Sequence, residues 1–151
     1  MAGRGIDADT RRAFVTAWNA SPRSVALPGG LHAGALAADL PLPYGQVKST
    51  RQEEPEFLAS IDGADSYLYR QRATVSILGV DKEPTGALIE VVKSVFGFRD
   101  FPVPNSLLRG CLFAGERILS EPHVKRGENL YRGEVWFTVL LVRSVPARVR
   151  A

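Results

Sequence analysis

YLYRQRATVSILGVDKEPTGALIEVVKSVFG, residues 67–97, changes its hydrophobic period once, and this change decides the fold. In its first half, apolar and aromatic residues alternate with polar ones, which is typical of a half-buried strand. The residues predicted to face the core are Tyr67, Tyr69, Ala73, Val75 and Ile77. The opposite face would carry Arg70, Arg72, Thr74 and Ser76. We therefore predict a long strand with one apolar face and one polar, basic face.

The second half of the stretch has the period of a helix. Its apolar residues recur at the spacing of one helical stripe, and they are Leu88, Val91, Val92, Val95 and Phe96. Either Asp81 or Glu83 would cap the start, and Pro84 suits a first turn. Gly97 suits the left-handed residue just past the end. This pattern predicts an amphipathic helix that packs on a sheet.

Upstream, a first helix is predicted from Asp9 or Thr10 to about Asn19. Its apolar residues at helical spacing are Phe14, Val15 and Trp18. Residues 1–7 show no periodicity and are predicted to be a loose end. A single domain spanning residues 1–151 is expected, with a second loose end at residues 146–151.

Between the first helix and the long strand, the pattern is weaker. Ser24–Leu27 is predicted as a short extended piece, and a strand is predicted to begin over Pro43–Ser49. The small apolar segment 31–42 has no clean period and leaves two interpretations, a weak helical turn or an irregular cover for a sheet edge. Arg51–Asp65 is polar and acidic, which indicates a loop joining two antiparallel strands.

Downstream of the second helix, residues 98–108 are predicted as a connection interrupted by prolines. Cys111–Leu119 is predicted as a strand, and Glu121–Asn129 as a polar hairpin tip. Leu130–Val145 is predicted as the last and longest strand. The sum is an α+β fold of order α-β-β-α-β-β. Its small, mostly antiparallel four-stranded sheet would carry the helices on one face.

The composition is that of an ordinary globular protein, with 45% hydrophobic and 23% charged residues. A formal net charge of +3 invites a nucleic-acid partner, but the basic residues are scattered among acidic ones, so nucleic acid is not expected as the main partner. Apolar runs fall short of the roughly 20 residues that a membrane span requires. No membrane partner is expected.

No catalytic or metal-binding constellation is apparent in the sequence. His32 and His123 lack the spaced ligands of a metal site, and Cys111 is interpreted as a small buried hydrophobe. The carboxylates of Glu53, Glu54 and Glu56 are interpreted as a solvated cluster in a loop. We therefore expect no enzymatic activity, no cofactor and no metal.

The final strand is apolar on both faces over its second half. A single layer of helices covers only one face, so Trp136, Leu140 and Val142 need another cover. Two covers are consistent with the pattern: a neighbouring subunit, or segment 31–42 folded over that face.

The order of these elements resembles the tail terminator, or tail completion, proteins of long-tailed bacteriophages, a family of head-to-tail joining proteins. The resemblance covers about Asp9 to Ser144. The stretches that carry it are the first helix, PYGQVKS, SYLYRQRATVSILGVDKEPTGALIEVVKSVFGF, GCLFAGERILSEPHV and NLYRGEVWFTVLLVRS. The final strand has the form Tyr-x-Gly-x-Val-x-Phe-x-Val that closes the fold in such proteins.

The resemblance implies a non-enzymatic virion protein that forms a homo-oligomeric ring, expected to hold about six subunits. The ring would cap the tail tube and join it to the head or neck, so its partners would be the tail tube protein and a head–neck connector protein. It would be located in the tail or neck of a phage or prophage virion assembled in the host cytoplasm.

The expected subunit and tube contacts lie on the uncovered face of the last strand and in the loops Arg51–Asp62 and Glu121–Asn129. The residues assigned to these contacts are Arg70, Arg72, Lys125, Arg126, Trp136, Leu140 and Val142. The alternative is a small α+β ligand-binding or enzymatic domain of another type. It predicts a concave pocket with convergent polar groups.

Overall fold

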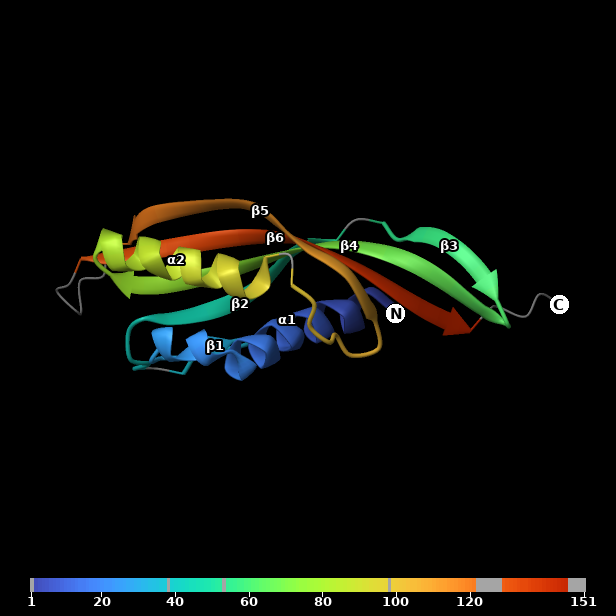
Figure 1. The fold of residues 1–151 in the computed structure, drawn as a ribbon, viewed down its shortest axis with the longest axis horizontal. Coiled ribbons are helices and arrows are strands. Elements are labelled where there is room, and N and C mark those ends of the chain that lie inside the picture. Colours follow the sequence, from blue (N-terminus) through green and yellow to red (C-terminus); the bar gives the residue numbers. More distant parts are fainter. Residues whose placement is uncertain (1, 38, 53, 98, 122–128, 147–151) are drawn as a thin grey trace.

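The computed structural model describes residues 2–37, 39–52, 54–97, 99–121 and 129–146 of the chain. Helices and strands both occur, as the predicted α+β class requires (Figure 1). The elements are α1 (Ala2–Ala20), the 3-10 helix η1 (Pro22–Ala26), β1 (Leu31–His32), β2 (Tyr44–Gln52), β3 (Glu56–Ile61), β4 (Ala64–Val80), α2 (Lys82–Phe96), β5 (Leu107–Glu121) and β6 (Leu130–Pro146). The predicted extended piece at Ser24–Leu27 is wrong, because η1 occupies most of it after a cap at Ser21.

One sheet contains all the strands, in the order β1-β2-β4-β6-β5, and β3 pairs with the remaining part of β4. The predicted four-stranded, mostly antiparallel sheet is therefore wrong in detail. Among the described residues the sheet has six strands, and it is mixed because β1 runs parallel to β2 while the other pairs are antiparallel.

The two strands that the sequence pattern misses are β1 and β3. Strand β1 has only two residues, too few for any period. Strand β3 lies inside the segment predicted as a loop, and most of its residues are exposed on both faces, so it has no alternation of apolar and polar residues. The Asp62–Gly63 turn joins β3 to β4, with φ of 53° and 77° at its two residues. Positive φ at both positions is what a tight hairpin turn requires.

The predicted alternation is confirmed along β6 but only along part of β4, because Thr74 and Ser76 of the predicted polar face are also buried, with 1% and 2% of their surface exposed. Alternate residues of the two strands are buried on the side of the sheet that the helices cover, and they include Tyr69, Ala73, Val75, Ile77, Val135, Phe137, Val139 and Leu141. The two strands are paired from Ala64 with Pro146 to Val80 with Leu130, without a register shift. This ladder is the centre of the sheet.

Both helices pack on the same face of the sheet, as predicted, and an aromatic cluster joins them there. Phe14 of α1 and Phe96 of α2 are 4.6 Å apart between ring centroids. Each also contacts Phe137 of β6, at 5.8 and 5.9 Å between centroids. Trp18 and Phe101 complete the cluster, and their rings contact Phe96. The core thus lies between the helices and the middle of β6.

Helix α1 begins at Ala2, well before the predicted start at Asp9 or Thr10. Residues 2–7, expected to be a loose end, therefore belong to the helix, and Ile6 is completely buried. The early turns escaped prediction because polar residues occupy the buried stripe. The Thr10 hydroxyl donates a hydrogen bond to Oε1 of buried Gln71 at 2.8 Å. Asp9, with 9% of its surface exposed, accepts one from Nη2 of Arg143 at 2.7 Å.

Helix α2 packs its apolar side on the sheet, and Val92 and Phe96 are buried as predicted. Buried Ile89 was not in the predicted stripe, and the predicted residues Leu88, Val91 and Val95 are only half-buried. The ends of α2 also differ from the predicted caps. The Asp81 side chain makes no capping hydrogen bond. Its carbonyl oxygen instead accepts one from the Thr85 hydroxyl at 2.8 Å. Gly97 has φ of −66°, so it is not left-handed as predicted. Glycine fits there because a Cβ atom would lie 2.7 Å from the Lys93 carbonyl oxygen.

The first turns of α2 approach the sheet over two glycines. A Cβ atom on Gly79 would lie 2.7 Å from Oγ1 of Thr85. A Cβ atom on Gly133 would lie 3.0 Å from Cδ1 of Ile89 and 3.2 Å from Cγ2 of Thr85. The glycine in the motif of the last strand is thus explained by close packing of a helix on the sheet.

Gly133→Val should lower the free energy of unfolding by about 1–3 kcal/mol, the usual cost of overpacking. The added branched side chain would occupy the space of Thr85 and Ile89 and force α2 outward. Denaturant unfolding measures the change. The matched control is Gly86→Ala within α2, whose Cβ would meet only Cδ1 of Ile118 at 3.7 Å. The control should be stabilising by about 0.5–1 kcal/mol, and an unchanged stability of Gly133→Val would contradict this account.

Candidate interaction surface

The face of the sheet opposite the helices is called here the outer face. Strand register places its residues in rows across β2, β4, β6 and β5. Four of these rows define the surface, and their members are Lys48, Thr74, Trp136 and Gly115; Arg72, Thr138 and Leu112; Arg70, Leu140 and Gly110; Leu68, Val142 and Leu107. The surface combines an apolar centre with basic side chains along β2 and β4.

The three apolar residues predicted on this face are half-buried in the isolated chain. Trp136 has partial cover from its own neighbours, because the Arg117 guanidinium lies 5.6 Å from the ring centroid. Arg117 is itself held by Glu134, with Nη2 and Oε1 2.7 Å apart. Leu112 and Leu107 extend the apolar area onto β5, with 40% and 53% of their surface exposed.

Segment 31–42, the alternative cover for this face, runs along the edge of the sheet. Leu31 and His32 pair with Gly45 and Gln46 of β2. The Gly34 carbonyl oxygen accepts a hydrogen bond from Nε2 of Gln46 at 3.0 Å. The described part of this segment therefore extends the sheet beside β2, away from Trp136.

The structure brings five of the seven predicted contact residues together on one surface. Arg70 and Arg72 are exposed on the outer face. Arg70 is in the row of Leu140, and Arg72 is in the row between those of Leu140 and Trp136. The remaining two, Lys125 and Arg126, lie outside the described residues.

A second surface includes most of the predicted contact loop Arg51–Asp62, where the structure has a strand that was not predicted. The hairpin formed by β3 and the start of β4, residues 54–66, projects beyond the helices and is called here the hairpin arm (Figure 1). Its large apolar residues are unusually exposed: Phe57 at 56%, Leu58 at 47% and Ile61 at 65%. The arm contains four acidic residues and no basic one. The sequence signal available for this surface was a group of large apolar residues in a stretch whose charged residues are all acidic.

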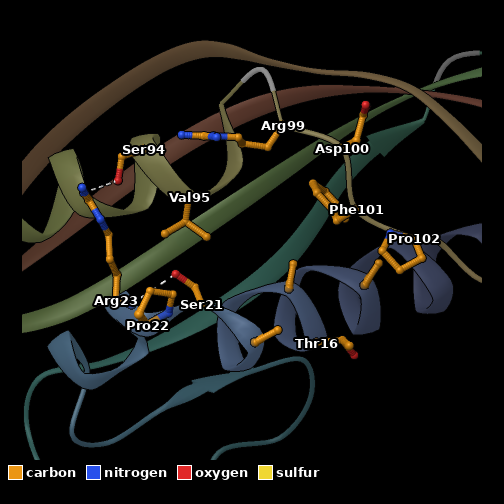
Figure 2. A pocket seen from close by; sticks show the side chains of 13 residues that line it. Thr16, Ser21, Pro22, Arg23, Ser94, Val95, Arg99, Asp100, Phe101 and Pro102 are labelled. Atoms are coloured by element: carbon orange, nitrogen blue, oxygen red, sulfur yellow. Dashed lines mark hydrogen bonds between the residues drawn. The ribbon is translucent and has the colours of Figure 1, made fainter.

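The described residues also form a groove between the two helices. It has a volume of about 530 Å³ and lies between α1 with η1 on one side and α2 with the following connection on the other (Figure 2). Ala13, Ala17 and Val95 line it, and Arg23 reaches across to Ser94, with Nη1 2.6 Å from Oγ. The groove is mainly apolar, and its charged groups come from Arg23 and the 99–100 segment.

Cys111 is buried in the core, and the His32 ring contacts the backbone of its own loop. Cys111 is buried on the helix side of β5, and this burial raises the pKa of its thiol from 9.0 to about 12. Nε2 of His32 lies 2.7 Å from the Gly29 carbonyl oxygen. Within the described ranges, no three His, Cys, Asp or Glu side chains are grouped as metal ligands would be. No described helix combines the length and apolar character needed to cross a membrane.

The Cys111 thiol should react with a thiol reagent at pH 8 more than about 100-fold more slowly in the folded protein than in denaturant. The unfolded chain loses this proton above pH about 9, whereas the folded chain keeps it until the pH approaches about 12. The unfolded state then binds fewer protons, so this thiol should lower stability as the pH rises through that window. Absorbance assays of thiol reaction, with Cys111→Ala as the blank, measure the rate. Equal rates in both states would contradict burial.

No protein-family model matches the sequence, and no curated protein matches it. A solved structure does match the fold, a chain of the "Virion of native gene transfer agent (GTA) particle". It superposes with a TM-score of 0.62 at 14% sequence identity, over 87% of this chain and 93% of that one. At this identity the similarity establishes a shared fold.

Proposed function

We propose that this chain is a structural, non-enzymatic protein of a phage-like virion, and that it acts as a tail terminator. The observation that carries the proposal is the fold shared with a chain of a gene transfer agent virion, which extends over 87% of this chain. The sequence resemblance to tail terminators, from Asp9 to Ser144, supports the same assignment independently.

In this role several copies form a ring that stops growth of the tail tube and offers a surface to the neck. Each subunit would use one surface to contact a different surface on the next, which is how a ring closes. The outer face suits such a contact because it combines an apolar centre with a basic border. Arg70, Arg72, Trp136, Leu140 and Val142 are the residues proposed to make it. Lys125 and Arg126 remain proposed contacts of the hairpin tip.

The test is the mass of the purified protein by light scattering over a range of concentrations, with and without a candidate tail tube protein. We expect either a ring of about six subunits in solution or a monomer that assembles on tube ends. Electron microscopy of polymerising tubes should then show capped ends and shorter tubes. A monomer that leaves tube length unchanged would contradict the proposal, provided that the same tubes elongate normally alone.

The groove between α1 and α2 favours the second candidate function, a small-molecule binding domain. Its volume of about 530 Å³ falls in the range of ligand pockets. This candidate predicts that a bound compound raises the melting temperature and that Arg23→Ala removes the effect. The first candidate is better supported, because it also accounts for the shared virion fold.

A further inference from the structure

We propose that the hairpin arm of one subunit docks on the outer face of a second copy of this chain. The inference deepens the proposed function, because ring closure needs one repeating contact between two unlike surfaces. The charge, the exposure and the placement of the two surfaces support it.

The hairpin arm has the composition of an interface that lacks its partner. Phe57, Leu58 and Ile61 each expose between 47% and 65% of their surface. β3 also lies at an edge of the sheet, since β4 is its one strand partner among the described residues. The acidic residues of the arm are Glu54, Glu56, Asp62 and Asp65. Exposed apolar side chains on an unpaired strand edge are unfavourable in water. Because all the charged residues of the arm are acidic, the arm is complementary to an apolar surface with basic residues.

The outer face supplies that surface. Three adjacent rows, around Trp136, Thr138 and Leu140, contain Lys48, Arg72 and Arg70 on their β2 and β4 sides, and their described residues include no acid. Lys48 and Arg72 form no ion pair within the described part of the chain. Arg70 has only a long contact, 4.0 Å from its Nη2 to Oε2 of exposed Glu56. These charges are therefore available to a partner at little cost.

The arm cannot cover the rows around Trp136 and Thr138 of its own chain; within the described residues, its only ion pair with the outer face is that of Glu56 with Arg70, at 4.0 Å. β3 is hydrogen-bonded to β4 in the plane of the same sheet, from Glu56 opposite Leu68 to Ile61 opposite Ala64. A strand fixed in that plane cannot also lie over it. Two arms pairing with each other would bring the acidic residues of both together, which is unfavourable. The outer face of another copy is the complementary surface that the chain itself provides.

The experiment exchanges the charges of the two surfaces. The arm variant carries Glu54→Lys and Glu56→Lys, and the face variant carries Arg70→Glu and Arg72→Glu. All four side chains are exposed, so both variants should keep the wild-type circular dichroism spectrum and melting behaviour. Each variant alone should need at least about 10-fold more protein to assemble, because its own arm and face now repel.

A 1:1 mixture of the two variants should assemble within about 3-fold of the wild-type concentration. In the mixture, each reversed surface meets an opposite charge on the other variant, so subunits alternate around the ring. Rescue by mixing cannot arise from a folding defect. Wild-type assembly should weaken as salt rises, since the contact pairs exposed charges.

Several results would overturn the inference: a wild-type protein that stays monomeric at the highest concentration reached, a variant that assembles normally, or a mixture no better than its parts. A normal face variant beside a defective arm variant would indicate arm-to-arm pairing instead. Tube capping by the same proteins separates this inference from the proposed function. Rescue without capping keeps the inference and contradicts the function. If each variant caps tubes without the other, the proposed function is kept and the inference is contradicted.

Discussion

Phe137→Ala should lower the free energy of unfolding by about 3–5 kcal/mol, the range for removing a fully buried phenylalanine ring. Phe137 lies where both helices meet the sheet, with Phe14 and Phe96 within 6 Å between ring centroids. Its loss leaves a cavity that three separate elements would have to close together, so relaxation is limited. Chemical denaturation followed by tryptophan fluorescence measures the change, because Trp18 belongs to the same cluster.

Phe137→Leu is the matched control, since it keeps most of the buried volume. It should cost clearly less than the alanine variant. A loss below about 1 kcal/mol for Phe137→Ala would mean that the cluster is not the centre of the core.

Trp136→Ala, one residue earlier on the same strand, should instead impair assembly. Trp136 lies on the outer face, half-buried beside Arg117, so its removal should cost folding only about 1–2 kcal/mol. Large aromatic side chains at the centre of an interface contribute about 2 kcal/mol or more to binding. We therefore expect assembly to require at least about 30-fold more protein. Light scattering measures it, alongside an unfolding curve.

Val25→Ala is a suitable control for Trp136→Ala. Val25 is 83% exposed in η1, away from the outer face, and its replacement should leave both assembly and stability unchanged. Normal assembly of Trp136→Ala with lowered stability would show that the indole serves the core of its own subunit.

The sequence was most informative where a single face is buried. The period of two along β6, and the burial of Val92 and Phe96 on α2, reflect burial on one side, and these predictions were confirmed. On β4 the prediction held only in part, because Thr74 and Ser76 are buried on the second face. The same alternation, from the sequence alone, predicted that Arg72 and Trp136 lie on the face opposite the core. On α1, Asp9 and Thr10 are polar residues of the buried stripe and were interpreted as the start of the helix, although the helix begins at Ala2.

The strand of the hairpin arm could not be predicted, because neither of its faces is buried. Strand β3 is exposed on both sides, so no alternation distinguishes it from a loop. The loop predicted over Arg51–Asp65 does contain the Asp62–Gly63 turn, but the strand before that turn was not predicted. Segment 31–42 was ambiguous because its position depends on pairing with Gly45 and Gln46, a non-local contact that leaves no local period. The most exposed surfaces of this molecule are thus the least visible in its sequence.

The long ladder between β4 and β6 has a consequence for the order of events during folding. Val80 pairs with Leu130 and Ala64 with Pro146, so α2 and β5 both lie in the loop that this pairing must close. Contacts so far apart along the chain carry a large loop-closure cost, and folds dominated by them form slowly. Before β6 pairs with β4, the apolar residues of β4 lack their core contacts with Phe137 and its neighbours on β6. During synthesis, the interval before β6 emerges from the ribosome is therefore when this chain is most exposed to aggregation and most dependent on chaperones.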